Sequence, residues 1–229
     1  MIKQTKCMPQ AVVFDMDGLI FDSERLVLDS WVEVGRKHHI EGIEEVFLAC
    51  IGTNKVKTRE IVDSHYGKDF PYDTFSVEAS AIFKEWVKKD GLPIKPGVEK
   101  TLMSLQERGI PLGLASSTRV AIVTEELQDA GLYDYFQVVM GGDQLKRSKP
   151  EPDIYLMTCE KLGVDPTLCY ALEDSYNGII SAYRAGMKPV MIPDMLPPTK
   201  EMEEKSVVIL ESMEQFIPWM EAQTDKQDW

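Results

Sequence analysis

Hydrophobic residues are unevenly distributed along the chain, and their spacing predicts two kinds of region. Residues 10–14 form a short β-branched and aromatic run that ends at an acidic pair, which is typical of a buried strand. Residues 23–89 follow a helical pattern, in which Val27, Ser30, Trp31 and Val34 share one face. Within this region we expect further helices over 53–66 and 72–89. The first region is therefore one strand followed by helices.

After breaks at residues 90–93 and 96–97, the pattern changes to short strands that alternate with longer helices. Strands are predicted at 111–115, 136–140, 169–172 and 189–192, with an edge strand at 207–210. A helical stripe precedes each of the first four, and each stripe ends at a glycine, the residue favoured just past a helix C-terminus. This alternation predicts a parallel sheet with helices on both faces.

The predicted fold class is α/β, a doubly wound parallel sheet with an inserted α-helical domain. The helical segment between the first two strands has roughly seventy residues, far more than a normal crossover needs. We therefore assign residues 1–21 and 93–229 to the core and residues 22–92 to the insertion. Ligands bind beyond the carboxyl ends of the strands in such sheets, so candidate chemistry is expected there.

Charge and composition restrict the partners of the chain. Lys and Arg number 25 against 38 Asp and Glu, and the net charge of −13 disfavours nucleic acids and anionic membrane surfaces as partners. No stretch approaches the ~18 apolar residues of a membrane span. The four cysteines (Cys7, Cys50, Cys159 and Cys169) form no C-x-x-C pair, so we expect free buried thiols. With no signal-peptide core near the N-terminus, we expect a cytoplasmic protein. We also expect it to be a monomer.

Side chains suited to chemistry follow the predicted strands: Asp15 and Asp17, Ser116 to Arg119, Lys149, and Glu173 with Asp174. Each group alone is also typical of a solvated turn or a helix cap. Together, however, the carboxylates would repel one another unless a divalent cation neutralised them. Oxygen ligands without clustered His or Cys indicate Mg²⁺ rather than zinc.

Serine and lysine beside a bound Mg²⁺ suit a phosphoryl group, whose oxygens gain charge in the transition state. One carboxylate can then act as the nucleophile and form an aspartyl-phosphate, while its neighbour handles the proton of the leaving group. The pattern therefore indicates phosphoryl transfer.

Four segments resemble, in chain order, the motifs of the haloacid dehalogenase (HAD) superfamily: FDMDGLIFDSE at 14–24, LASS at 114–117, KPEPDIY at 149–155 and LEDSYNG at 172–178. The resemblance spans nearly the whole chain. It is nearest to the subgroup that contains β-phosphoglucomutase, pseudouridine-5′-phosphatase and 2-deoxyglucose-6-phosphatase. It implies a HAD-like Rossmannoid core with a helical cap that closes over the substrate and determines specificity.

The resemblance also implies residue roles. Asp15 would be the nucleophile, and Asp17 would be the general acid and then the base for the attacking water. Ser116 would bind the transferring phosphoryl group, and Lys149 would balance its charge. The implied Mg²⁺ site consists of Asp15, the main-chain carbonyl of Asp17, and Asp174, with Glu173 supporting the metal shell.

The implied substrate-binding residues are Lys55, Ser117, Thr118 and Arg119. In the mutase, a cap arginine and a Ser/Lys pair bind a second phosphate, and Lys55 and Thr118–Arg119 occupy these positions here. Lys55 could equally be a solvated surface lysine, and Arg119 a helix-start residue. The cap histidine that marks the mutase falls at Val27, which favours hydrolysis of a small phosphorylated metabolite.

Two alternatives remain open at this point. One is a phosphosugar mutase on the same scaffold. The other is a receiver-like signalling module that accepts a phosphoryl group on an aspartate without turnover. The long helical insertion and the second aspartate, Asp17, argue against the signalling module.

Overall fold

The computed structural model describes residues 8–51, 53 and 55–224 of the protein. The chain divides into two compact units. One joins the chain up to Phe21 to the chain from Ile94 onward, and the other consists of Asp22–Pro93.

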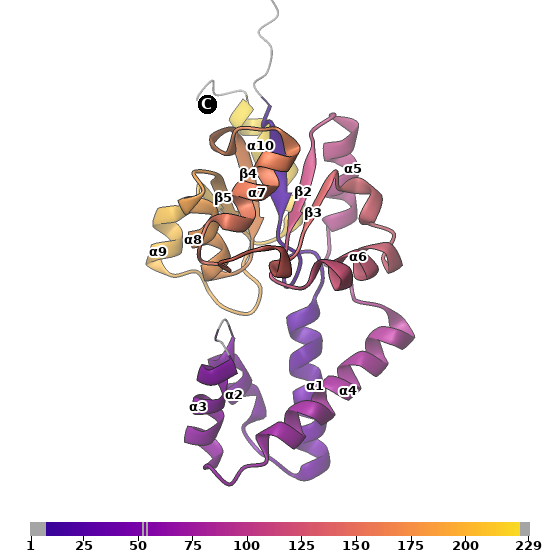
Figure 1. The fold of residues 1–229 in the computed structure, drawn as a ribbon, viewed down its shortest axis with the longest axis vertical. Coiled ribbons are helices and arrows are strands. Elements are labelled where there is room, and N and C mark those ends of the chain that lie inside the picture. The colour runs from indigo at the N-terminus through magenta and orange to yellow at the C-terminus, as the bar shows by residue number, and fades with distance from the viewer. Residues whose placement is uncertain (1–7, 52, 54, 225–229) are drawn as a thin grey trace, which may run out of the picture. The chain divides into compact units, whose positions relative to one another are not determined.

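The first unit contains a six-stranded sheet in which every pair of neighbouring strands is parallel. The strand order is β3-β2-β1-β4-β5-β6 (Figure 1). The strands are β1 (Ala11–Phe14), β2 (Leu112–Ala115), β3 (Val138–Met140), β4 (Cys169–Glu173), β5 (Lys188–Met191) and β6 (Val208–Ile209). The predicted parallel α/β fold is therefore confirmed, and each predicted strand is present.

Side chains that alternate along the strands place apolar groups on both faces of the sheet. Ala11 and Val13 of β1 belong to the same buried cluster as Ile154 of helix α7 (Asp153–Leu162). On β4, Tyr170 contacts Phe216 and Trp219 of α10 (Phe216–Thr224), with ring centroids 6.0 and 5.3 Å apart. Helices cover both faces, as the sequence predicts.

The other helices of this unit are α5 (Val98–Glu107), α6 (Val120–Asp129), α8 (Tyr176–Arg184) and α9 (Lys200–Lys205). The helical stripe predicted before the strand at 169–172 is observed in α7, where Ile154 and Thr158 are buried. This helix ends at Gly163, whose φ of 70° lies in the left-handed region that glycine tolerates best.

The described residues of the second unit form four helices: α1 (Ser23–His38), α2 (Ile43–Cys50), α3 (Lys55–Tyr66) and α4 (Tyr72–Asp90). Its core is centred on Trp31 of α1, which packs edge-on against Phe47 and Phe75 at centroid distances of 5.3 and 5.2 Å. Trp31 and Val34 are buried, as their helical spacing predicts, whereas Val27 is only half-buried. The segment predicted to be helical is therefore helical.

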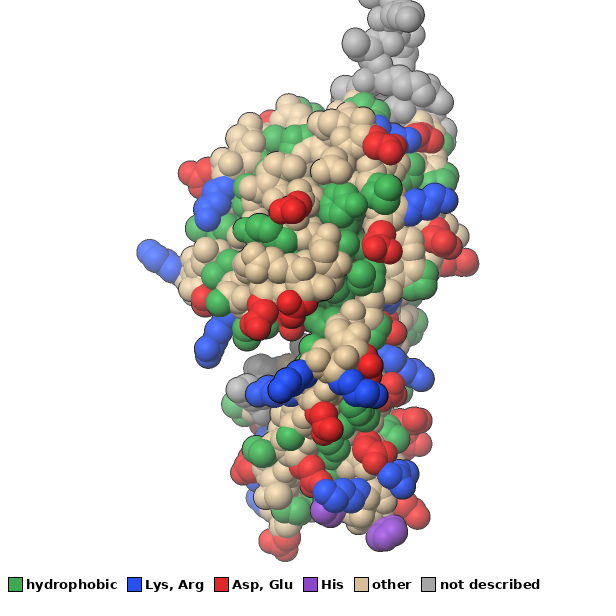
Figure 2. Space-filling model, turned by 90° about the vertical axis from the view of Figure 1, so that its right-hand side faces the viewer, with side chains coloured by type: hydrophobic (Ala, Val, Ile, Leu, Met, Phe, Trp, Pro, Cys, Tyr) green, Lys and Arg blue, Asp and Glu red, His purple; other side chains and the backbone are tan. Residues whose placement is uncertain are grey.

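Acidic and basic side chains are interspersed over the face of the molecule shown in Figure 2.

Cys50, Cys159 and Cys169 are buried and free, as expected, while Cys7 lies outside the described residues. Among the described helices, none is both long enough and apolar enough to cross a membrane.

Candidate active site

Asp15 follows β1 directly, at the carboxyl edge of the sheet. Its backbone N–H donates to the carbonyl of Leu172 at 3.0 Å, so the β1–β4 ladder continues to the edge. β1 lies between β2 and β4, where successive strands change from one side of the sheet to the other. Such a switch point opens a crevice between the loops that follow the strands. Asp15 therefore lies where a ligand is expected to bind.

A tight turn after Asp15 keeps the next residues at this edge. The carbonyl of Met16 accepts from the N–H of Ile20 at 2.8 Å, and the N–H of Gly18 donates to Phe21 at 3.0 Å. Gly18 has a φ of +77°, and a Cβ at this position would overlap the carboxylate of Asp174. Glycine thus permits both the turn and the close approach of the backbone to Asp174.

Lys149 links three of the segments that the sequence assigned to the site. Its ammonium donates to Asp15 Oδ1 at 2.5 Å, to Glu173 Oε1 at 2.6 Å and to the carbonyl of Ala115 at 2.9 Å. The Lys149 side chain is only 6% exposed. A buried ammonium is tolerated because all three of its donors are used.

Burial and neighbouring charges shift the pKa values of Lys149 and Asp15. Burial opposes the charged form of Lys149, but Asp15 and Glu173 outweigh it and raise the pKa of the lysine. Burial raises the pKa of Asp15 to about 8; Lys149 counteracts this shift, whereas Glu173 and Asp17 add to it. The cluster therefore has more negative groups than the Lys149 ammonium balances, and a divalent cation would favour the ionised form of Asp15.

Glu173 is fixed by four hydrogen bonds. Its Oε1 accepts from Lys149 and from the buried Tyr155 hydroxyl at 2.5 Å, and its Oε2 accepts from Ser175 Oγ at 3.1 Å and Ser175 N at 3.4 Å. Ser175 also caps α8, because its Oγ accepts from the N–H of Gly178 at 3.1 Å. Neither Tyr155 nor Ser175 is among the site residues predicted from the sequence, although both lie in its motif segments, at 149–155 and 172–178.

We expect Gly178→Ala to destabilise the first unit, because a Cβ at this position would overlap the Glu173 carboxylate. Overpacking of this kind costs about 1–3 kcal/mol. In a chain of this size it should lower the Tm by about 2–10 °C. Thermal denaturation followed by circular dichroism would measure the change. Asn177→Ala, at an exposed neighbouring position, is the matched control. An unchanged Tm for Gly178→Ala would contradict the proposed close contact.

Two hydroxyl groups that follow β2 contact the carboxylate of Asp17. Thr118 Oγ1 donates to Asp17 Oδ2 at 3.0 Å, and Ser116 Oγ lies 3.5 Å from the same oxygen. Ser116 is buried, and its Oγ accepts from the N–H of Thr118 at 3.0 Å. The structure therefore brings together Asp17, Ser116 and Thr118. Thr118 was predicted to bind the substrate, and in the structure its hydroxyl contacts Asp17.

The other predicted substrate-binding residues are not in this cluster of hydrogen bonds. Ser117 and Arg119 are exposed, and Arg119 is the residue before α6. Lys55 begins α3 in the second unit, and its side chain lies outside the described part of the chain.

The carboxylates of Asp15, Glu173 and Asp174 form a group that fits a divalent cation. Oxygen atoms from the three side chains lie within 4.8 Å of one another, and all three residues are buried. The ligand atoms here are hard carboxylate oxygens, which suit Mg²⁺ or Ca²⁺ better than softer metals. Since Glu173 already accepts four hydrogen bonds, Asp15 and Asp174 are better placed to act as direct ligands.

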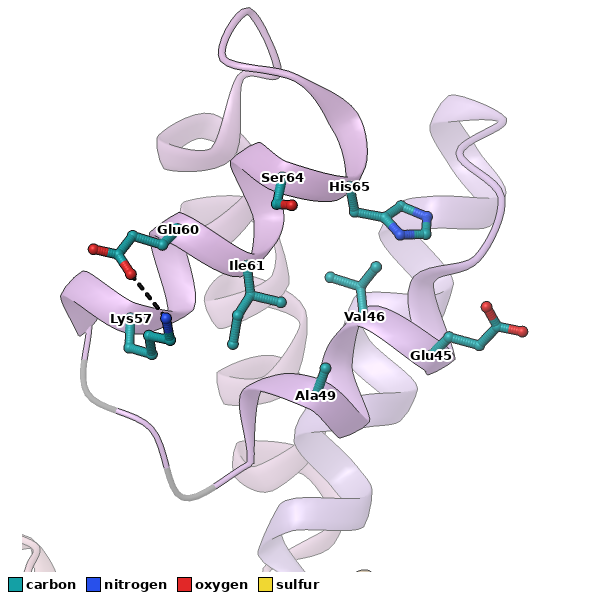
Figure 3. Close-up of a pocket in the computed structure, with 8 residues that line it drawn as sticks. All are labelled: Glu45, Val46, Ala49, Lys57, Glu60, Ile61, Ser64 and His65. Atoms are coloured by element: carbon teal, nitrogen blue, oxygen red, sulfur yellow. Dashed lines mark hydrogen bonds and ion pairs between the residues drawn. The ribbon is translucent and has the colours of Figure 1, made fainter.

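The second unit has a separate pocket of about 380 Å³ between α2 and α3 (Figure 3). Val46 and Ile61 point into it, and the pair formed by Lys57 Nζ and Glu60 Oε2, 3.0 Å apart, lies on one side. None of its lining residues, all of them described, belongs to the predicted catalytic set. The pocket therefore contributes no residue to the cluster at the strand ends.

The site can be compared with known proteins. The sequence profile of the haloacid dehalogenase-like hydrolases matches residues 12–192. Hexitol phosphatase B of Escherichia coli K12 is 32% identical over 199 residues, which cover 80% of this chain and 83% of that protein. A phosphorylated carbohydrates phosphatase of Thermotoga maritima is 30% identical over 216 residues, covering 91% and 96%. The structure of a HAD family hydrolase from Deinococcus radiodurans R1 covers 95% of this chain and 98% of its own, with a TM-score of 0.81 at 21% identity.

Proposed function

The chain belongs to the haloacid dehalogenase-like hydrolase family, and on that basis we propose that it is a Mg²⁺-dependent phosphatase of a small phosphorylated metabolite. The observation that carries the proposal is the buried Asp15, hydrogen-bonded to Lys149 and within reach of Asp174 at the carboxyl edge of the sheet. The relatives named for phosphorylated carbohydrates and hexitols favour a sugar phosphate or sugar-alcohol phosphate as the substrate class.

In the proposed first step, a carboxylate oxygen of Asp15 attacks the phosphorus of the substrate. The bond between phosphorus and the leaving oxygen breaks, and Asp17 donates a proton to that oxygen. Asp17 is held for this role by the hydroxyl of Thr118 at 3.0 Å. The products of this step are the free alcohol and an aspartyl-phosphate on Asp15.

In the second step, Asp17 removes a proton from a water molecule, which attacks the phosphorus of the aspartyl-phosphate. The bond between phosphorus and Asp15 breaks, so inorganic phosphate leaves and the carboxylate is restored. Ser116 would donate a hydrogen bond to the phosphoryl oxygens, while Lys149 balances the charge of Asp15 and Glu173 throughout.

Mg²⁺ would be held by Asp15, the carbonyl of Asp17 and Asp174, and it would supply positive charge to the phosphoryl oxygens. Glu173 would act indirectly, because its oxygens hold Lys149 and Ser175 in place. The helical insertion, residues 22–93, would provide the contacts that select the substrate.

A screen of phosphate release tests the proposal. Purified protein with MgCl₂ would be incubated with hexose phosphates, hexitol phosphates, nucleotides and an aryl phosphate. We expect repeated turnovers, with the highest kcat/KM among sugar or sugar-alcohol phosphates. A single phosphorylation without turnover would support the signalling module. Conversion of β-glucose 1-phosphate to glucose 6-phosphate, primed by a bisphosphate and without free phosphate, would support the mutase.

Metal binding should also change the thermal stability of the protein. We expect MgCl₂ to raise the Tm of the EDTA-treated protein, since a cation relieves the repulsion among Asp15, Glu173 and Asp174. At 100 times the dissociation constant the stabilisation would be about 2.7 kcal/mol. This corresponds to about 5–10 °C in a chain of this size. KCl at equal ionic strength is the control, and an equal rise with KCl would count against a specific site.

A further inference from the structure

The loop after β5 brings one more acid to the carboxyl edge of the sheet. Asp194 lies three residues beyond Met191, the last residue of β5. Its Oδ1 accepts from Lys95 Nζ at 2.5 Å, and the same ammonium donates to the carbonyl of Gly18 at 2.8 Å. Lys95 thus links the β5 loop to the turn that carries Asp15 and Asp17.

This contact is well enclosed within the first unit. The side chains of Lys95 and Asp194 are only 20% and 12% exposed. The backbone of Lys95 is fixed too, because the N–H of Lys95 donates to the carbonyl of Ile20 at 2.8 Å. Lys95 is therefore held by its backbone N–H as well as by its ammonium, unlike the mobile side chains of an exposed ion pair.

The second oxygen of Asp194 points to a further role. Its Oδ2 is buried, and no described residue donates a hydrogen bond to it. A Cβ on Gly18 would lie 3.4 Å from this oxygen and would also overlap Asp174. Carboxylate oxygens of Asp194 and Asp174 lie within 4.8 Å of each other. A buried carboxylate oxygen without a donor is costly, so a donor between these groups is expected.

We propose that Asp194, oriented by Lys95, is a positioning residue for the divalent cation. Its Oδ2 accepts a hydrogen bond from a water in the hydration shell of the cation that Asp15 and Asp174 hold. Mg²⁺ usually retains several waters, and residues that hold such outer contacts tune its affinity. This inference rests on the proposed function, because it concerns the same metal site.

The test is the Mg²⁺ affinity of the EDTA-treated and dialysed protein, measured by isothermal titration calorimetry without substrate. We expect Asp194→Ala to weaken Mg²⁺ binding about 10–100-fold, the usual effect of losing such an outer contact. Asp194→Asn keeps the shape and one acceptor oxygen, so its loss should be smaller. Asp134→Ala removes the same charge at an exposed position and should stay within about twofold of wild type.

Lys95→Met separates positioning from simple charge effects. Removing a positive charge near a cation site should tighten Mg²⁺ binding if only Coulomb attraction matters. If Lys95 positions Asp194 and the Gly18 turn, the same variant should bind Mg²⁺ more weakly. Tighter or unchanged binding by Lys95→Met would overturn the inference, as would wild-type affinity of Asp194→Ala.

One further measurement, together with the Mg²⁺ affinity of the wild type, keeps the outcomes distinct. Urea denaturation of the metal-free variants identifies any that fail to fold, and Asp194→Asn then carries the test. If the wild type itself binds no Mg²⁺, the cofactor of the proposed function is wrong. If the wild type binds Mg²⁺ and Asp194→Ala binds it equally well, only the role of Asp194 is wrong.

Discussion

Asp15→Asn should abolish phosphate release, lowering kcat/KM by about 10⁴-fold or more, as expected when a nucleophile is lost. An amide cannot form the acyl-phosphate, and it cannot attract Mg²⁺ as a carboxylate does. The fold should survive the change. Asparagine has nearly the same size and shape as aspartate, and burial already opposes the charged form of Asp15 by raising its pKa. Phosphate release on the best substrate of the screen and the Tm of the metal-free protein would be measured together.

Asp134→Asn, at an exposed position of the same unit, is the matched control and should retain wild-type kinetics. Acid quench after incubation with ³²P-labelled substrate should give labelled wild-type protein and unlabelled Asp15→Asn. Substantial turnover by Asp15→Asn, with the amide verified by mass spectrometry, would show that another residue is the nucleophile.

Lys149→Met should reduce both activity and stability. The variant leaves Asp15 and Glu173 side by side without the ammonium that both now contact. Removing one partner from a buried charge pair costs about 3–5 kcal/mol. The Tm of this chain should then fall by about 10 °C. We expect kcat to fall by about 10²–10³-fold, because a charge that stabilises the transferring phosphoryl group is lost.

Lys161→Met provides the comparison for Lys149→Met. Lys161 is an exposed lysine in the last turn of α7, so its substitution should change neither Tm nor kcat measurably. MgCl₂ should restore part of the lost Tm of Lys149→Met, because the cation replaces some of the missing positive charge. Wild-type stability in Lys149→Met would mean that the three hydrogen bonds of this lysine contribute little.

The sheet could be predicted because its strands are short apolar runs, bounded by glycine and alternating with amphipathic helices. The helices α9 and α10 were not predicted, and the reason is physical. α9 has six residues, mostly charged, and its one buried residue is Met202. α10 contains Pro218, which breaks a local helical pattern, and it is stabilised by contact of Phe216 and Trp219 with Tyr170, far away in the sequence.

The candidate site was predictable to the extent that it consists of residues at strand ends. Parallel strands bring their carboxyl ends together, so Asp15, Lys149 and Glu173 could be grouped before any distance was known. The same rule applied to the strand at 189–192 would have included Asp194. By contrast, the bond between Tyr155 and Glu173 depends on how α7 packs on the sheet, which no local pattern encodes.

The central place of β1 also has a consequence for biosynthesis. Val12 pairs with Leu112 on one side and with Tyr170 on the other, so β1 is completed by segments that the ribosome makes much later. At about 5–20 residues per second, the first of these partners follows roughly 5–20 s behind. The helical unit Asp22–Pro93 is contiguous and lies between β1 and β2 in the sequence, so the whole of it is synthesised within that interval. The nascent apolar strand, meanwhile, must be shielded from aggregation until β2 emerges.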